Sequence, residues 1–241
     1  MHHLRIVGHE LEVLPPKLAT SCSNLISLSL TSNRLVDVDC VAQLTRLTSL
    51  VLLRNKLPKL PSTVGNLVSL KVLELASNRL EALPATFGNL TNLSKLNIEC
   101  NRLRRIPETL ARLTIKTLNV NSNDLVNLPH CIGSMRNLVQ ISANDNKLKY
   151  LPADIGESKS LEAIHVCNNR LMELPDSIDN LGKTLKHLWL DFNNLSALPM
   201  TFHKMEVLEE LKMEGNVSMV SCQLMMTADH GCGCKAAASL Y

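Results

Sequence analysis

Four side chains in the C-terminal third of the sequence combine a thiol, two imidazoles and a carboxylate. They are Cys167, His165, His187 and Asp191. Such groups make up a nucleophilic hydrolase when the fold brings them within hydrogen-bonding distance and shields them from water. The sequence contains no glycine-rich phosphate loop, HExxH pair or nucleophile elbow. The elements that carry the four side chains therefore decide whether they can do chemistry.

A second group of potential ligands lies near the C-terminus and consists of Cys222, His230, Cys232 and Cys234. Zinc modules use paired Cys-x-x-Cys ligands, whereas this segment has one Cys-x-Cys and two single ligands. We therefore predict no metal site and no cofactor. Residues 217–241 are interpreted instead as a non-repeat tail, which we expect to be poorly ordered.

A repeated phrase, Leu-x-Leu-x-x-Asn-x-Leu-x-x-Leu-Pro, organises the rest of the chain. It occupies residues 73–84 and returns at 96–107 with isoleucine at two of the leucine positions. A fixed period of this size indicates a solenoid, in which each unit buries its apolar face against its neighbours. We predict one repeat domain over residues 1–216, with about nine to ten units. Its asparagine recurs every 22 to 24 residues, at Asn33, Asn55, Asn78, Asn101, Asn123, Asn146, Asn169, Asn193 and Asn216.

Each unit is predicted to contain one strand and one short turn. Aliphatic residues stand five and three positions before each asparagine, as Leu28 and Leu30 do before Asn33, and this alternation is typical of a strand with one buried face. Stacked units place these strands in a parallel sheet on the inner curve of a horseshoe. A proline early in most returns disfavours regular helix, so we expect short helical or 3₁₀ turns on the convex face. The predicted class is an α/β solenoid.

The asparagine column has a predicted structural role. Where each strand turns outward, backbone groups face the interior without a partner in the sheet. A carboxamide both donates and accepts hydrogen bonds, so it can satisfy these groups within its own unit and in the neighbouring one.

Two units and both ends depart from the pattern. Asp39 stands where other units have proline, with one residue missing, and residues 179–188 contain one extra residue. The first predicted strand begins at Leu4 with an open edge, and the repeat pattern ends after Asn216. A segment of a longer repeat protein, or an imperfect gene model, would have such ends, and we state this as a hypothesis.

The consensus sequence of the units resembles that of one branch of the leucine-rich repeat proteins. Two units show this consensus clearly: LPSTVGNLVSLKVLELASNRL at residues 60–80 and LPADIGESKSLEAIHVCNNRL at residues 151–171. The branch comprises the intracellular plant Ras-group-related proteins, the Shoc2 and Ras-suppressor proteins, and the repeat domains of Erbin and Scribble. The resemblance implies a horseshoe scaffold that binds small GTPases, phosphatase subunits or polarity proteins.

Outward-facing strand residues on the concave face are the candidate binding surface. The middle strands carry small and polar residues there, whereas the last three strands carry an aromatic and charged group. An exposed tryptophan flanked by charges has the composition of an interaction hot spot. Alternatively, Trp189 packs over its strand neighbours or under the tail. A second, smaller and weaker apolar spot on the same face consists of Val51 and Leu53. The predicted protein-binding residues are His165, His187, Trp189, Asp191, Phe192 and Lys212.

Charge and composition exclude several classes of partner. The net charge is +3, and only 2% of residues are aromatic, so we predict no nucleic-acid binding. A basic column follows the asparagines, and we interpret it as a solvated edge. No apolar run is long enough for a signal peptide or a membrane span. The basic column consists of Arg34, Lys56, Arg79, Arg102, Lys147 and Arg170.

These observations favour a non-catalytic protein-interaction scaffold or adaptor in intracellular signalling. An open concave sheet neither excludes water nor fixes a triad, so we expect no catalytic residues. Five single cysteines in the repeats show no regular spacing that would pair them, which favours reduced thiols in the cytoplasm. We also expect a monomer unless the open ends associate. The alternative is a targeting or autoinhibitory segment of a larger signalling enzyme, such as a kinase, ROCO-type GTPase or cyclase.

Overall fold

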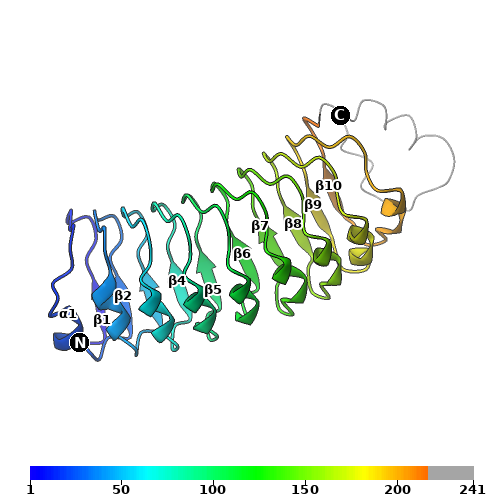
Figure 1. Cartoon of the computed structure of the whole chain (residues 1–241). Helices are drawn as coiled ribbons and strands as arrows, with labels where there is room; N and C mark the ends of the chain where they lie inside the picture. Colours follow the sequence, from blue (N-terminus) through cyan, green and yellow to red (C-terminus); the bar gives the residue numbers. More distant parts are fainter. Residues whose placement is uncertain (217–241) are drawn as a thin grey trace.

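The computed structural model describes residues 1–216, which form a gently curved stack of coils (Figure 1). Each coil contributes one short strand to a single ten-stranded sheet, in which the strands follow one another in sequence order and every neighbouring pair is parallel. This confirms the predicted solenoid. The strands are β1 (His3–Arg5), β2 (Ser27–Ser29), β3 (Ser49–Val51), β4 (Val72–Glu74), β5 (Lys95–Asn97), β6 (Thr117–Asn119), β7 (Gln140–Ser142), β8 (Ala163–His165), β9 (His187–Trp189) and β10 (Glu210–Lys212).

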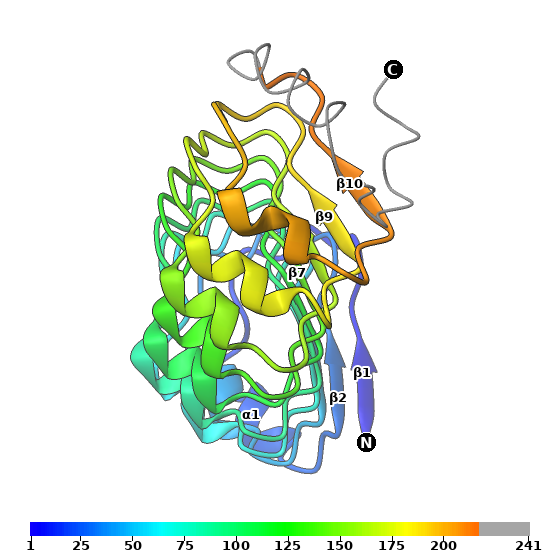
Figure 2. The ribbon, with the colours of Figure 1, turned by 90° about the vertical axis from the view of Figure 1, so that its right-hand side faces the viewer.

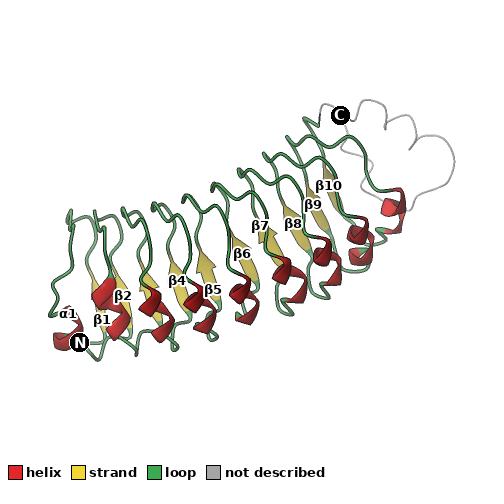
Figure 3. Ribbon diagram, viewed as in Figure 1, coloured by secondary structure: helices red, strands yellow, loops and turns green. Residues whose placement is uncertain are grey.

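Short helical turns line the side of the stack opposite the sheet (Figures 2 and 3). All but the first are 3₁₀ turns, and a proline precedes seven of them in the extended conformation, as predicted. The turns are α1 (Leu18–Ser21), η1 (Asp39–Gln43), η2 (Ser62–Asn66), η3 (Ala85–Asn89), η4 (Glu108–Arg112), η5 (His130–Ser134), η6 (Ala153–Glu157), η7 (Asp176–Leu181) and η8 (Met200–Lys204).

The core consists of aliphatic columns that run the length of the stack. The central residue of each strand from β2 to β9 is buried and lies beside its equivalent in the next coil, as Leu28 does beside Leu50. The third residue of each 3₁₀ turn from η2 to η8 closes the core from the other side, with Phe87 fully buried. Burial of these columns against their neighbours is the main stabilising contribution in a solenoid.

The buried asparagines hydrogen-bond within and between coils. The Nδ2 group of Asn101 donates to the carbonyl oxygens of Ile98, in its own coil, and of Leu75, in the preceding coil, at 3.1 and 3.0 Å. Its Oδ1 accepts from the backbone N–H of Leu80 at 3.0 Å. The other eight asparagines of the column make equivalent bonds, so we call the column the buried ladder. Each asparagine locks one coil to the coil before it.

Both irregular units are accommodated outside the sheet, one just before its turn and the other within it. The residue before each later 3₁₀ turn is proline, and in η1 this place is taken by Val38 rather than by Asp39. The missing residue therefore precedes the turn, which corrects the predicted alignment by one position. The extra residue of the later unit lengthens η7 to six residues, against five in η1–η6 and η8. Turn length can change because the sheet register does not depend on it.

Candidate functional site

The open face of the sheet carries a cluster of polar and aromatic side chains over β8, β9 and β10. We call it the aromatic cluster, and it consists of His165, His187, Trp189, Glu210 and Lys212. The sheet register places His165 beside Trp189 and Trp189 beside Lys212, and it places His187 beside Glu210. The alternation of each strand directs these side chains away from the core.

Both faces of the Trp189 indole are occupied within the cluster. The His165 ring stacks on it with 3.8 Å between ring centroids and 12° between ring planes. The Lys212 Nζ lies 3.8 Å from the indole centroid, a distance suited to a cation–π contact. Because β9 lies between β8 and β10, the imidazole and the ammonium approach from opposite sides. The indole therefore stands upright and presents its edge to solvent.

Glu210 organises the cluster and was missed in the sequence. Its carboxylate accepts a hydrogen bond from Trp189 Nε1 at 2.8 Å and lies 3.3 Å from Lys212 Nζ and 3.5 Å from His187 Nδ1. The hydrogen bond from Trp189 and the charge of Lys212 hold the pKa of Glu210 below its usual value. Extending the strand alternation two residues earlier, to the column that holds His187, would have found it.

His165 lies in surroundings that favour its neutral form. Burial lowers its pKa, and the neighbouring His187 and Lys212 lower it further, whereas Glu210 acts in the opposite direction. Its Nδ1 lies 3.4 Å from Gln140 Nε2 and 3.5 Å from Ser142 Oγ, on the neighbouring strand β7. The imidazole is thus held between the indole and two polar side chains.

The thiol of Cys167 is poorly placed for catalysis. It lies 3.6 Å from the Asp191 carboxylate rather than against an imidazole. Burial and the Asp191 charge raise its pKa to about 11, so the thiol stays protonated at neutral pH. An activated thiol requires the opposite arrangement, with a base or a positive charge beside it. Residues 165, 167 and 191 therefore do not form a nucleophilic triad.

Asp191 and Phe192 lie beside the aromatic cluster and belong to the end of the same coil. Asp191 Oδ1 accepts from the backbone N–H of Glu214 at 2.8 Å. The backbone N–H of Phe192 donates to the carbonyl oxygen of Glu214 at 2.6 Å, and the Phe192 side chain is half exposed. These contacts join the ends of the β9 and β10 coils.

Much of the remaining open face is engaged internally. The backbone N–H two residues before each buried-ladder asparagine points toward the preceding coil, and outward side chains cap it in the later coils. Asn121 Oδ1 accepts from Asn144 N and Asn144 Oδ1 from Cys167 N, both at 2.8 Å. Asn97 and Asn119 each cap the backbone N–H two residues later in their own coil. We call these residues the surface ladder; the sequence identified them only as small and polar residues of the middle strands.

Two residues assigned to the exposed face are buried. Ser142 is 6% exposed and accepts a hydrogen bond from Gln140 Nε2, while Ala76 is 5% exposed. Both side chains are small, so they extend only a short way from the backbone. The predicted outward direction does not guarantee contact with solvent.

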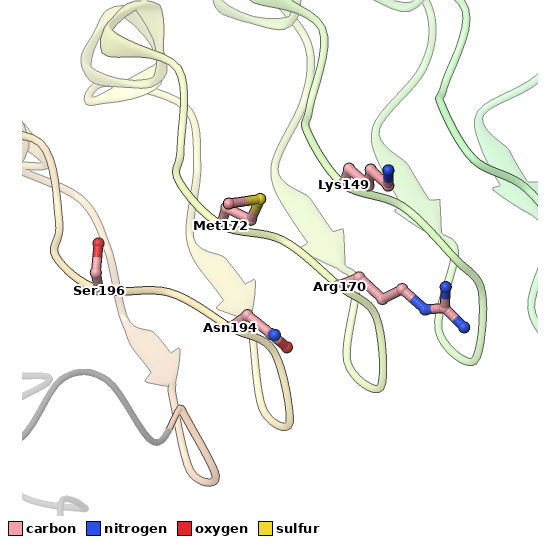
Figure 4. A pocket seen from close by; sticks show the side chains of 5 residues that line it. All are labelled: Lys149, Arg170, Met172, Asn194 and Ser196. Atoms are coloured by element: carbon pink, nitrogen blue, oxygen red, sulfur yellow. The ribbon is translucent and has the colours of Figure 1, made fainter.

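A shallow depression of about 420 Å³ lies on the flank where coils leave the sheet (Figure 4). Lys149, Arg170, Met172, Asn194 and Ser196 line it, along successive coils. Elsewhere in the basic column, Arg34 pairs with Glu10 and Lys147 with Asp124, each at 2.6 Å. Neighbouring acids thus offset part of the column, as expected of a solvated edge.

Residues 1–216 hold no group of three or more histidine, cysteine, aspartate or glutamate side chains arranged to bind a metal. The same residues include no helix of the length and apolarity needed to cross a bilayer. The cysteine and histidine group at residues 222–234 lies outside the described residues.

A parallel sheet built from coils of about 23 residues, with an asparagine ladder and 3₁₀ returns, defines a leucine-rich repeat solenoid. Two family models agree with this assignment, one described as "Leucine Rich repeats (2 copies)" over residues 68–112 and the other as "Leucine rich repeat" over 159–217. The chain therefore contains leucine-rich repeats, and domains of this kind are suited to protein–protein interaction.

Similar repeats occur in proteins of different kinds. Over 108 residues, 44% of this chain, the sequence is 32% identical to an adenylate cyclase of Schizosaccharomyces pombe, of which it spans 6%. The leucine-rich repeat domain of APL1B superposes with a TM-score of 0.76 at 23% identity, over 88% of this chain and 61% of that one. The ectodomain of the Arabidopsis thaliana receptor kinase GASSHO1/SCHENGEN3 was solved in complex with CASPARIAN STRIP INTEGRITY FACTOR 2. It superposes with a TM-score of 0.73 at 30% sequence identity, over 88% of this chain and 27% of that one.

The chain therefore spans less than two thirds of each of these three proteins. Each similarity covers repeats, and leucine-rich repeats generally form non-catalytic interaction modules. The cyclase similarity extends over less than half of the present chain, so it carries no catalytic activity across. Fold and repeat class are shared, and the partner has to be inferred from the surface.

Proposed function

We propose that the protein is a non-catalytic scaffold or adaptor that binds a protein partner through the aromatic cluster on the open sheet face. The observation that best supports this proposal is the fixed arrangement of His165, Trp189 and Lys212, of which the last two contact the Glu210 carboxylate. Tryptophan at the centre of a surface cluster, with charged groups around it, is the composition enriched in binding hot spots.

Pre-organisation supports this assignment. The indole is fixed by two ring contacts and one hydrogen bond, so binding would order few additional rotamers there. In contrast, the surface-ladder asparagines use their Oδ1 atoms for the backbone, which leaves fewer free groups over β5–β7. The C-terminal third is therefore the better candidate for the contact.

The resemblance to the Ras-group branch leads us to propose a small GTPase or a phosphatase subunit as partner, in the cytoplasm. The five cysteines in residues 1–216 are free thiols, which agrees with a reducing compartment. A second candidate function is that of a repeat segment within a larger signalling enzyme. The similarity to part of a fission-yeast adenylate cyclase favours that candidate.

Affinity capture from native cells tests the proposal with three versions of the full chain. The variant is His165→Ala with Trp189→Ala, and the matched control is His130→Ala, which removes a histidine from the turn side of the stack. Circular dichroism verifies that each version is folded. We expect a small set of captured proteins that is lost in the double variant and kept in the control. Capture that is unchanged by the double variant would contradict the proposed site.

The identity of the captured proteins distinguishes the two candidates. A GTPase or phosphatase subunit would support the adaptor. An extended form of this chain carrying a catalytic domain, detected in the same cells by peptides beyond residues 1 and 241, would support the enzyme segment instead.

A further inference from the structure

The backbone gives no reason for an aromatic side chain at residue 192. The residue before each buried-ladder asparagine from Asn33 to Asn193 has a φ between 53° and 56°, in the left-handed region. That region favours glycine and asparagine and is unfavourable for bulky side chains. Phe192 is the only aromatic residue at this position within residues 1–216. The others are Ser32, Arg54, Ser77, Cys100, Ser122, Asp145 and Asn168.

Burial does not compensate for this choice, because 52% of Phe192 is exposed. The ring lies across Gly215 of the following coil, where a Cβ atom would collide with ring atom Cδ1. Gly215 thus leaves room for the ring, and its own φ of 71° suits glycine. An aromatic side chain is therefore displayed at the edge of the sheet without being needed for the core.

A free carboxylate lies on the same coil edge. Glu214 is the residue whose carbonyl oxygen accepts the 2.6 Å hydrogen bond from Phe192 N, so the two residues are direct neighbours. The Glu214 side chain is exposed and forms no ion pair with any other side chain of residues 1–216. Asp191, which accepts from Glu214 N, adds a second carboxylate beside it.

Carboxylates outnumber ammonium groups on the open face of the β9 and β10 coils, to which Phe192 belongs. The outward residues of the β9 and β10 coils include the carboxylates of Asp191, Glu210 and Glu214, against the single ammonium of Lys212. That ammonium is already committed to Glu210 at 3.3 Å and to the Trp189 ring at 3.8 Å. A partner group that meets Phe192 and Glu214 together should therefore be cationic.

We propose that Phe192 and Glu214 form a binding site for an arginine side chain of the partner protein, an inference that rests on the proposed function. A guanidinium is planar, so it can stack on the exposed phenyl ring while its N–H groups pair with the carboxylate. An ammonium cannot form both contacts with the same fixed geometry. The site extends the aromatic cluster toward the edge of the sheet and gives it a chemical specificity.

Selection from a random peptide library displayed against the full chain tests this inference. We expect enriched peptides to share one arginine, and an arginine-to-alanine change in them to weaken binding about tenfold or more. Phe192→Asn should weaken it similarly while leaving the melting temperature unchanged or higher, since asparagine suits the left-handed backbone. Met200→Asn, which also replaces an exposed apolar residue, is the control and should leave binding unchanged. Glu214→Lys should shift the enriched residue from arginine to aspartate or glutamate.

Two outcomes separate this inference from the proposed function. Peptides without a basic residue that bind the wild type and are lost in Trp189→Ala, but not in Phe192→Asn, would overturn the arginine site and keep the aromatic cluster as the binding surface. No enrichment, or enrichment that is insensitive to Trp189→Ala, Phe192→Asn and Glu214→Lys alike, would overturn both.

Discussion

The imidazole of His165 lies flat on the indole of Trp189, with 3.8 Å between the ring centroids. Trp189 is the only tryptophan in the chain, so its fluorescence reports on this contact alone. The two residues belong to adjacent strands and face each other in register. Trp189 fluorescence can therefore be used to follow a contact that belongs both to the sheet and to the proposed binding surface.

Protonation of His165 at low pH should change the fluorescence of the stacked Trp189. The pKa of His165 is lowered from its usual 6.5, chiefly by burial and then by His187 and Lys212. On acidification the unfolded chain therefore takes up this proton before the folded chain does, so the contribution to stability is complete above pH 6.5 and declines as the pH falls toward the folded-state pKa. Trp189 fluorescence should titrate with a midpoint below 6.5.

Melting temperatures measured across the same pH range give the second readout. The wild type should lose stability relative to His165→Gln as the pH falls below 6.5. His203→Gln removes a histidine from η8, on the other side of the stack, and should leave the fluorescence titration unchanged. A midpoint at or above 6.5 would show that the imidazole is not desolvated as the structure indicates.

The two ladders should differ in their contribution to stability. Asn101→Ala removes a buried carboxamide, so the backbone N–H of Leu80 loses its acceptor and the carbonyls of Leu75 and Ile98 each lose one of their two asparagine donors. The variant should therefore cost about 1–3 kcal/mol or more. Asn144→Ala removes one cap, from the N–H of Cys167, and should cost about 0.5–1.5 kcal/mol. Urea unfolding of both variants checks the order. Equal losses would mean that the surface ladder is as buried as the inner one.

The sequence predicts the repeat and the buried faces because both follow from local rules. Alternation fixes which strand residues face the core, and the recurrence of asparagine fixes where each strand ends. Leu28, Leu30 and Asn33 are all buried as expected. A deletion within a unit is harder to place, because the proline slot of η1 could be aligned with either Val38 or Asp39. Backbone geometry alone resolves that choice.

The contacts of the open face could be predicted only in part. Adjacent strands bring residues about 23 positions apart into register, so His165, Trp189 and Lys212 could be grouped from the sequence. Whether Trp189 stacks, and on which partner, depends on side-chain rotamers that no spacing rule gives. Glu210 was missed because the third outward position was considered on β9, where it holds His187, and not on β10.

Close approach of successive turns makes a further prediction at Gly133. A Cβ atom at this residue would collide with the carbonyl oxygen of Asp154 in η6, so Gly133→Ala should destabilise the fold by about 1–3 kcal/mol through overpacking. Ala111 holds the same position in η4, and Ala111→Gly should therefore bring no gain in stability. Thermal unfolding of the two variants compares these effects. A silent Gly133→Ala would show that the turns can move apart.

The surface ladder is incomplete over the first strands, and completing it is the most direct test of its role. Leu53 stands in its coil where Asn121 stands in a later one, and the backbone N–H of Ala76 has no acceptor among residues 1–216. Leu53→Asn should supply that acceptor. Because the substitution also removes a partly buried aliphatic side chain, the proper reference is Leu53→Ala.

The asparagine variant should be more stable than the alanine variant by about 0.5–1.5 kcal/mol, the usual net value of one hydrogen bond. Hydrogen exchange of the Ala76 amide provides an independent readout, since an N–H that donates a hydrogen bond exchanges more slowly than one without an acceptor. Slower exchange together with the stability difference would establish that outward asparagines act on the backbone. If both variants have the same stability and the same exchange rate, the asparagines of the middle strands are free after all, and the binding surface must be extended to include them.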